Sequence, residues 1–281
     1  MYLLRVIPAT KIPLPAPQVL TYFSAHELLP GSLVSTPVHN RKATGVVLEC
    51  EKINGQKMSL RQAEFELRGI TKIINAEPVV IDKQIQLAKW ISEYYYCPLG
   101  SVMKLMLPAK STIATKLKTN QPANQKLILA PEISFIDKIA KDNKIKNYAT
   151  LQSGQTDKQY DENWLKIKSG EKIIIATRMA LFAPFQNLKE IIIEDEHNDL
   201  YKSRQTPRYH ARETALELAK IWNAKIIFKS NTPSIETSRL ARDKKIMLQY
   251  PVSKIQHQTS IIDLRVELKE KNFSIFSRLL Q

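Results

Sequence analysis

The sequence predicts an α/β protein in two parts: a small β-rich N-terminal domain, then a mostly parallel sheet with helices on both faces. Three observations favour this class. The chain of 281 residues is long enough for two domains with separate cores. Residues 1–49 are strand-like and interrupted by prolines. After residue 125, Ile-rich apolar runs alternate with amphipathic segments.

The N-terminal part contains three strand-like runs and closes with a helix. Residues 79–96 follow Pro78, a helix start signal, and repeat apolar side chains near helical spacing. We therefore expect one domain over residues 1–108. Its strand-like runs are YLLRVIPA (2–9), GSLVSTPV (31–38) and TGVVLECE (44–51).

The segment between the two parts is basic and polar. No acidic residue occurs between Tyr94 and Pro131, whereas lysines accumulate there. This composition predicts a linker over residues 109–125, with phosphate contact as a secondary role. The second domain is then expected to span residues 126–281.

The second part contains six apolar runs, and amphipathic segments such as residues 157–168 and 208–222 lie between most of them. Continuous Ile-rich runs, as opposed to alternation, predict strands buried on both faces and hence a parallel sheet. The runs are KLILAPE (126–132), NYATLQSG (147–154), EKIIIATR (171–178), LKEIIIEDE (188–196), AKIIFKSN (224–231) and KIMLQY (245–250).

The chain is strongly basic. Lys and Arg number 42 against 27 Asp and Glu, which gives a formal net charge of +15 and a sequence pI of about 9.6. This excess favours a polyanionic partner such as DNA, RNA or an acidic membrane face. A lysine-rich composition with a solvated basic surface is the alternative.

The cysteines and the start of the chain indicate a cytoplasmic protein. Cys50 and Cys97 are far apart and have no CxxC partner, so neither a zinc site nor a disulfide is expected. The first residues lack the regions of a signal peptide, and no apolar run approaches the ~20 residues of a membrane helix. We expect no metal site and no membrane partner.

An acidic tetrapeptide follows the apolar run at residues 188–193. Ligands of open α/β sheets gather at the carboxyl ends of strands. A nucleotide hydrolase uses carboxylates there to hold magnesium and to activate water, and a following imidazole relays the change. The candidate catalytic residues are therefore Glu194, Asp195, Glu196 and His197. A charged strand exit that simply meets solvent is the alternative.

A basic and aromatic segment, YKSRQTPRYHAR, comes next at residues 201–212. Guanidinium and ammonium groups bind phosphates, and tyrosine rings stack on bases, a combination that suits single strands. The candidate DNA-binding residues in this segment are Lys202, Arg204, Arg208, Tyr209 and Arg212.

The order of these segments resembles the first motor lobe of the primosomal replication-restart helicases, the PriA family. The resemblance implies a RecA-like parallel α/β lobe, a DNA partner and a DNA-facing turn at Arg178, for which helix capping or carboxylate pairing is the alternative. The strings GSLVSTPVHNRKATGVV and LAKWISEYYYCPLGSVMKLMLP resemble the family's N-terminal 3′-end-binding domain. The lobe strings are APEIS, QSG, IIIATRMALFAPFQNLKEIIIEDEHNDLYKSRQTPRYHAR, SNTPSIETS and IIDLR.

The resemblance fails where a helicase holds its nucleotide. A P-loop, G-x-x-x-x-G-K-[ST], cradles the triphosphate, but none of the seven glycines is followed by lysine. The P-loop and the family's winged-helix domain would lie between LMLP and APEIS, where only AKSTIATKLKTNQPANQKLIL occurs. The sequence ends shortly after IIDLR, so a second lobe with its arginine finger and zinc insertion is not expected. We therefore expect no cofactor and no ATP-driven unwinding.

The acidic motif is also altered. The family's Asp-Glu-Glu-His reads EDEH at residues 194–197, and its Ser-Ala-Thr reads Ser230-Asn231-Thr232. Catalysis of phosphoryl transfer depends mainly on positioning, so these changes agree with an incomplete, inactive RecA-like lobe.

The resemblance implies a partly retained 3′-end pocket. Where the family has Phe-Asp-Tyr, this chain has Leu20, Thr21 and Tyr22, and a neutral threonine accepts hydrogen bonds more weakly than a carboxylate. His39 matches a glycine position and Arg68 a lysine position. The DNA contacts implied here are Tyr22, His39 and Arg68.

The other aromatic residues favour packing roles. Trp90, Trp164 and Trp222 lie on predicted helices and are expected to pack against the sheets. The tyrosines at residues 94–96 are expected to divide between core and solvent, because three consecutive helical positions cannot all face inward.

Three hypotheses follow. The leading one is a non-enzymatic DNA-binding protein of the replication-restart type, which binds branched or single-stranded DNA and recruits other restart proteins. The second is an ATP-dependent 3′-5′ DNA helicase that uses ATP and magnesium, with a partner chain or a non-standard segment supplying the missing P-loop. The third is a folded remnant of a larger gene, in which loss of the P-loop strand leaves a neighbouring strand unpaired.

Overall fold

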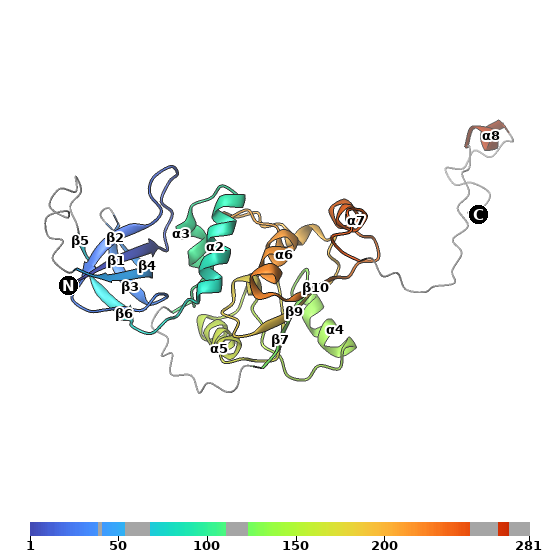
Figure 1. Cartoon of the computed structure of the whole chain (residues 1–281). Coiled ribbons are helices and arrows are strands. Elements are labelled where there is room, and N and C mark those ends of the chain that lie inside the picture. The colour runs from blue at the N-terminus through green and yellow to red at the C-terminus, as the bar shows by residue number, and fades with distance from the viewer. Residues whose placement is uncertain (39–40, 54–67, 111–122, 248–263, 270–281) are drawn as a thin grey trace. The chain divides into compact units, whose positions relative to one another are not determined.

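The computed structural model describes residues 1–38, 41–53, 68–110, 123–247 and 264–269 (Figure 1). The chain divides into two compact units, residues 1–234 and residues 235–281. The first unit contains both sheets. The domain boundaries that the sequence predicts after residues 108 and 125 stay a prediction, because most of the predicted linker, residues 111–122, lies outside the described residues.

A six-stranded sheet forms the N-terminal part, in the order β5-β2-β1-β4-β3-β6, which confirms the predicted β-rich region. Its neighbouring strands are antiparallel, except that β2 and β5 are parallel. The sequence analysis predicted β1, β3 and β4 but not the other three strands. The strands are β1 (Tyr2–Pro8), β2 (Leu20–Ser24), β3 (Leu33–Val38), β4 (Arg41–Lys52), β5 (Arg68–Gly69) and β6 (Lys72–Asn75).

Two helices follow this sheet, α2 (Asp82–Tyr94) and α3 (Leu99–Met106). α2 confirms the predicted helix with narrower bounds. α3 packs very closely against the end of β1, because a Cβ atom on Gly100 would lie 2.1 Å from the carbonyl oxygen of Thr10. Only glycine permits such an approach of two backbones.

Four parallel strands form the second sheet, in the order β10-β9-β7-β8, which confirms the predicted parallel arrangement. The strands are β7 (Gln125–Leu129), β8 (Ile173–Ala176), β9 (Leu188–Ile193) and β10 (Lys225–Phe228). The helices of this part are α4 (Ser134–Asp142), α5 (Asp157–Lys168) and α6 (Ala211–Trp222), with the short 3-10 helices η1 (Arg178–Phe182) and η2 (Asp199–Tyr201).

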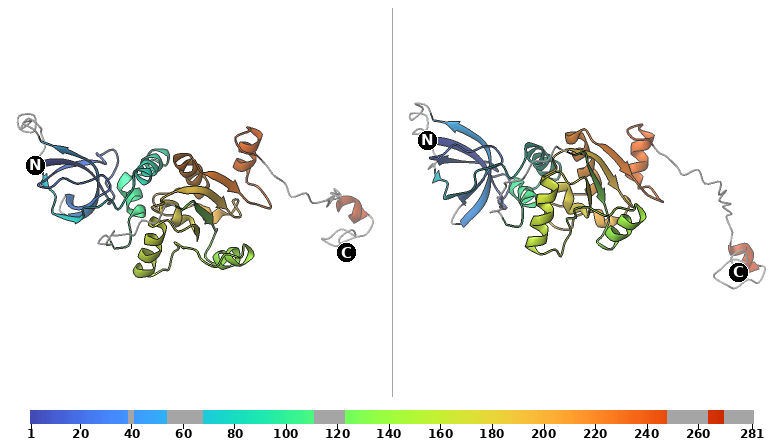
Figure 2. Two further views of the ribbon diagram at one scale, coloured as in Figure 1. Left: turned by 60° about the horizontal axis from the view of Figure 1, so that its bottom comes forward. Right: turned by 90° about the horizontal axis from the view of Figure 1, so that it is seen from below.

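Helices cover both faces of the parallel sheet (Figure 2). Ile128 of β7 packs in one cluster with Ile136 and Ile139 of α4. The next residue, Leu129, belongs to the main core, which contains Trp164 of α5 and Leu218 and Trp222 of α6. Because alternate residues of a strand point to opposite faces, α4 covers one face, whereas α5 and α6 cover the other. Both tryptophans are buried, as predicted.

Two predicted strands differ from the structure. Residues 147–154 contribute only one parallel bridge, between Ala149 and Ile174, and then turn at Gly154, whose φ is +86°. In the run at residues 245–250, the first three residues are not a strand, and the last three lie outside the described residues.

Within the first unit, polar contacts connect α2 and the residues before it to helices that accompany the parallel sheet. Gln84 Nε2 donates to the carbonyl oxygen of Phe182 at 2.7 Å. Lys168 Nζ donates to the carbonyl oxygen of Pro78 at 2.7 Å. These bonds supplement an apolar core that contains residues from both sheets.

The second unit contains α7 (Ile235–Arg242) and α8 (Leu264–Lys269). None of the helices in the described ranges combines the length and the apolar composition that a membrane span requires.

Candidate functional site

The candidate site lies at the carboxyl edge of the parallel sheet. The register places Ile193, the last residue of β9, opposite Phe228 of β10 and Leu129 of β7. The pairing continues past the strands, because the backbone N–H of Lys229 donates to Ile193 at 2.9 Å. Residues 194–197 and residues 229–234 therefore leave the sheet side by side, at the edge where open α/β sheets bind ligands.

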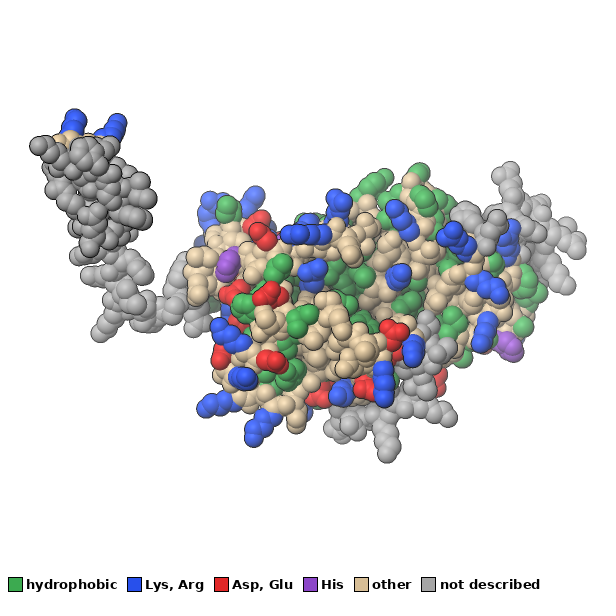
Figure 3. All heavy atoms as spheres, turned by 180° about the vertical axis from the view of Figure 1, so that it is seen from behind, with side chains coloured by type: hydrophobic (Ala, Val, Ile, Leu, Met, Phe, Trp, Pro, Cys, Tyr) green, Lys and Arg blue, Asp and Glu red, His purple; other side chains and the backbone are tan. Residues whose placement is uncertain are grey.

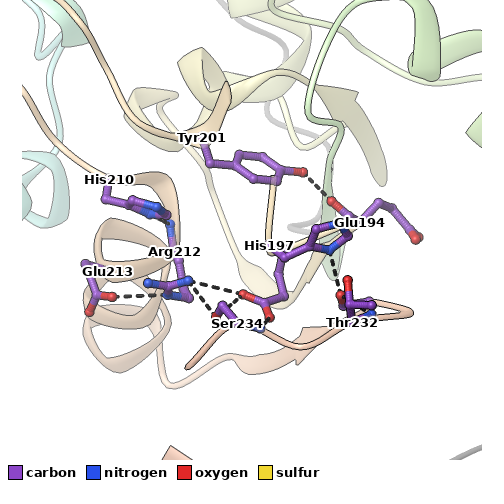
Figure 4. Close-up of polar contacts among 10 residues, drawn as sticks. Glu194, His197, Tyr201, His210, Arg212, Glu213, Thr232 and Ser234 are labelled. Atoms are coloured by element: carbon purple, nitrogen blue, oxygen red, sulfur yellow. Dashed lines mark hydrogen bonds and ion pairs between the residues drawn. The ribbon is translucent and has the colours of Figure 1, made fainter. Parts of the chain in front are cut away.

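Glu196 is buried in a network of hydrogen bonds and an ion pair, and its partners Arg212 and Ser234 are labelled in Figure 4. Glu196 as a whole is 1% exposed. One carboxylate oxygen accepts from the backbone N–H of Ser234 at 2.7 Å, and the other accepts from the Ser234 hydroxyl at 2.9 Å and from Arg212 Nη1 at 3.2 Å. Both oxygens of Glu196 are thus engaged within the protein, and the carboxylate joins the loop after β10 to the start of α6.

Glu194 is paired with a lysine of the neighbouring loop. Lys229 Nζ lies 2.7 Å from Glu194 Oε1, and the two side chains are 45% and 19% exposed. Glu194 is the first carboxylate of the acidic motif for which the sequence suggests a magnesium-holding role. Here an ammonium group of the chain itself already neutralises that carboxylate.

The other two motif residues lie at the same edge. Asp195 has a φ of +47°, a left-handed conformation that places the turn directly after the strand. His197 is exposed, and its Nδ1 shares a hydrogen bond of 2.6 Å with the Ser230 hydroxyl. Glu194, Glu196 and His197 thus all contact side chains from the loop after β10.

Tyr201 fixes the backbone of the acidic segment through its hydroxyl group. Its ring is fully buried, and its hydroxyl lies within hydrogen-bonding distance of two carbonyl oxygens, 2.9 Å from Leu129 and 2.6 Å from Glu194 (Figure 4). Burial raises the pKa of this hydroxyl, and the nearby carboxylates raise it further. Tyr201 therefore remains a neutral donor that fixes the backbone at Glu194.

The arrangement favours a structural role for the acidic segment. Among the residues that the structure describes, no group of three or more His, Cys, Asp or Glu is placed to hold a metal ion. The catalytic role that the sequence suggests for Glu194, Asp195, Glu196 and His197 stays a prediction.

The basic segment forms a loop whose two ends are hydrogen-bonded to each other. Lys202 and His210 form an antiparallel bridge, and the N–H of Ser203 donates to the carbonyl oxygen of Tyr209 at 2.8 Å. The side chains of Lys202, Arg204 and Arg208 are exposed. Exposed Lys and Arg side chains are also distributed over the face in Figure 3, with hydrophobic side chains between them.

Three other predicted DNA contacts have partners within the fold. Tyr209 is 4% exposed and packs edge-to-face on Phe182, with ring centroids 4.9 Å apart. Burial raises the pKa of the Tyr209 hydroxyl. Arg212 is 5% exposed, and Arg178 Nη1 donates to the carbonyl oxygen of Leu200 at 2.6 Å. Their DNA contacts stay predictions beside these structural roles.

The residues of the predicted 3′-end pocket are divided. Tyr22 and Arg68 are opposite each other in the register of β2 and β5. Tyr22 is buried, and its hydroxyl donates to the carbonyl oxygen of Pro37 at 2.8 Å, whereas Arg68 is exposed. His39 lies outside the described residues. Of Tyr22 and Arg68, only the side chain of Arg68 is therefore accessible to a ligand.

The sequence analysis missed the partners of the acidic segment. Lys229, Ser230 and Ser234 belong to the polar turn at residues 229–234, in which Ser230-Asn231-Thr232 was identified by resemblance, but contacts between this turn and the acidic segment were not predicted. Their contacts depend on β10 pairing in parallel with β9, which brings the carboxyl ends of these two consecutive strands to the same edge of the sheet. The available signal was that the acidic turn and the polar turn each directly follow an apolar run, and that these two runs are consecutive in the sequence.

Comparison with a family model covers the N-terminal part. Residues 10–108 match the model described as the 3′ DNA-binding domain of PriA. Among the described elements, this range contains the five strands β2 to β6 of the six-stranded sheet and both α2 and α3.

Relatives extend the similarity beyond that domain. Replication restart protein PriA of Bacillus subtilis is 35% identical over 162 residues, which cover 54% of this chain and 20% of the relative. The protein of the same name from Helicobacter pylori strain J99 is 30% identical over 282 residues, which cover 81% of this chain and 43% of the relative. The one from Rickettsia prowazekii is 28% identical over 318 residues, which cover 90% and 47%.

These alignments have two consequences. This chain spans less than half the length of the three relatives. The Helicobacter alignment is 282 positions long but contains only 81% of a 281-residue chain, so about one aligned position in five faces no residue of this chain. The relative therefore has segments inside the aligned region that this chain lacks.

Proposed function

Because this chain belongs to the PriA family of replication restart proteins, we propose that it binds branched or single-stranded DNA without ATP-driven unwinding. The observation that carries this proposal is the match of residues 10–108 to a 3′ DNA-binding domain. The net charge of +15 supports a phosphate backbone as the partner. We further propose that the parallel sheet is an incomplete RecA-like lobe.

The absence of unwinding is supported by the sequence and by the contacts at the sheet edge. The printed sequence contains no G-x-x-x-x-G-K-[ST], so no such loop is available to cradle a triphosphate. Lys229 neutralises Glu194, and Arg212 and Ser234 engage both oxygens of Glu196. These contacts use the carboxylates to hold two loops together.

Binding of a labelled forked DNA across a salt series tests the DNA-binding part. For about three phosphate contacts, a fourfold rise in salt is expected to lower the affinity about 40-fold. An affinity that does not change with salt would contradict phosphate contacts. The absence of any affinity would favour a folded gene remnant.

The same forked DNA tests the absence of unwinding. Steady-state ATP hydrolysis with and without DNA is expected to stay at the level of a sample without protein. DNA-stimulated turnover that disappears in Asp195→Asn would overturn this part of the proposal. The matched control is Asp199→Asn, an exposed aspartate in η2.

An ATP-dependent 3′-5′ helicase that works with a partner chain is the second candidate. The hydrogen bond of 2.6 Å between His197 and Ser230 favours it, because it links the two polar turns at the ligand edge. Under this candidate a partner would supply the P-loop, and ATP and Mg²⁺ would be cofactors. ATPase activity that appears only when a P-loop protein is added would favour it.

The remaining expectations concern the DNA end, the partners and the location. Thr21 is exposed beside Tyr22, and equal affinities for oligonucleotides with 3′-hydroxyl and 3′-phosphate ends would indicate that the free end is not recognised. Other replication-restart proteins are proposed as further partners, and the cytoplasm is proposed as the location.

A further inference from the structure

The C-terminal end of α2 exposes aromatic side chains. Tyr94 is 59% exposed and Tyr96 is 79% exposed. The Tyr94 ring is stacked on Trp90, with centroids 4.7 Å apart and an interplanar angle of 15°. Trp90 itself is partly buried against the main core. The stack holds the ring of Tyr94 in a fixed orientation while much of its surface remains open.

Tyr95 anchors this aromatic end to the rest of the unit. Its ring meets Trp90 and Tyr94 edge-on, at 6.2 Å and 4.9 Å between centroids. Its hydroxyl accepts from the backbone N–H of His210 at 3.0 Å, and burial raises its pKa. Tyr96 lies two residues beyond the end of α2 and has a φ of +47°. The predicted division of the tyrosines between core and solvent is therefore confirmed.

Cations lie beside the aromatic end. Lys202 Nζ is 5.3 Å from the centroid of the Tyr95 ring. Lys202 and His210 also form the antiparallel bridge that joins the two ends of the basic loop. Lys202 and His210 both contact Tyr95, so the ends of the basic loop are held next to the C-terminal end of α2. The exposed cations Arg204 and Arg208 lie on this loop.

On the basis of the proposed DNA-binding function, we propose that Trp90, Tyr94 and Tyr96 form a stacking surface for the unpaired bases of single-stranded DNA. Lys202, Arg204 and Arg208 contact the phosphates next to those bases. A single strand offers both a π-face and a negative charge at every nucleotide, which matches exposed rings beside exposed cations. A duplex keeps its base faces stacked inside, so it is expected to use only the cations.

A pair of oligonucleotides tests the stacking surface. An oligothymidine is compared with an oligonucleotide of the same length and phosphate number that has an abasic tract in its centre, by fluorescence anisotropy with the full chain. The chain is expected to bind the oligothymidine at least about 5-fold more tightly, the lower bound for stacking one base. Equal affinities for the two oligonucleotides would overturn the proposal.

Variants locate the preference on α2. The double change Tyr94→Leu with Tyr96→Leu is expected to abolish the preference for thymidine while keeping the salt dependence, because no phosphate contact is removed. The matched change to phenylalanine keeps the rings and is expected to keep the preference. Thermal unfolding checks that each variant folds. If the double leucine variant unfolds, Tyr96→Leu alone decides, since its side chain is the most exposed of the three tyrosines.

The outcomes separate this inference from the proposed function. No affinity for any DNA overturns both. Salt-dependent binding of forked DNA with an unchanged leucine variant overturns only the stacking surface. A leucine variant that keeps the thymidine preference but loses a protein partner would assign the surface to that protein and also overturn the inference.

Discussion

The connection between β9 and α6 uses charge in two different ways. At its ends, Glu194 pairs with Lys229 and the buried Glu196 pairs with Arg212. In its middle, Arg204 and Arg208 are exposed on a loop. The comparison teaches that the charges nearest the sheet hold loops together, whereas the charges farther along the connection remain available to a polyanion.

Removing the buried carboxylate is expected to have the largest effect. Glu196→Ala leaves Arg212 buried without this partner, which costs ~3–5 kcal/mol of the free energy of unfolding. Urea denaturation measures the change. Glu213→Ala is the control, because its carboxylate also contacts Arg212, at 3.2 Å, but is 31% exposed, so less than ~1 kcal/mol is expected. Similar losses in both variants would contradict the special role of Glu196.

The exposed part of the connection should affect DNA and not folding. Arg204→Ala with Arg208→Ala is expected to lower the affinity for forked DNA about tenfold at low salt and to reduce the slope of log affinity against log salt by about 2. The free energy of unfolding should change by less than ~0.5 kcal/mol. The control is Lys138→Ala with Lys141→Ala on α4. Unchanged DNA affinity in the arginine variant would remove this loop from the interface.

A partly buried cation, Lys168, sharpens the comparison through pH. Burial lowers the pKa of Lys168 from 10.5 to about 8. Between these values the unfolded chain binds more protons than the folded chain, so the contribution of Lys168 to the free energy of unfolding rises with pH. Lys168→Met is expected to remove this rise, as measured by urea denaturation from pH 7 to pH 10.5. A constant difference between wild type and variant over that range would contradict the expectation.

The smallest effect is expected at the partly exposed pair. Lys229→Ala should cost less than ~1 kcal/mol, because solvent screens the ion pair with Glu194. A double-mutant cycle with Glu194→Gln measures the coupling between the two side chains. A coupling as large as the loss in Glu196→Ala would show that both ends of the connection contribute equally.

The sequence was sufficient for the fold class because strands buried on both faces leave continuous apolar runs in the sequence. The Ile-rich runs at 188–196 and 224–231 could be recognised as β9 and β10, since strands buried on both faces are apolar throughout. The run at 147–154 failed because its polar residues and Gly154 favour a turn after one bridge. Local pattern alone did not separate these cases.

The site was less predictable than the fold. Glu194, Glu196 and His197 were identified from their place after a strand, but each has a partner in the loop after β10, which lies 33 to 38 residues later in the sequence. Such partners are decided by which strands become neighbours. Arg212 was predicted as a DNA contact because a cation in a basic segment carries no sign of its burial.

The contact between α3 and the end of β1 limits what can happen at position 100. A single methyl group there would overlap two carbonyl oxygens, those of Thr10 and Pro8, at 2.1 Å and 2.3 Å. In a library of random substitutions selected for folded protein, we expect glycine alone at this position, even though the residue touches no ligand. At this position the tolerance to substitution is thus limited by the direct contact between the backbone of α3 and the backbone at the end of β1.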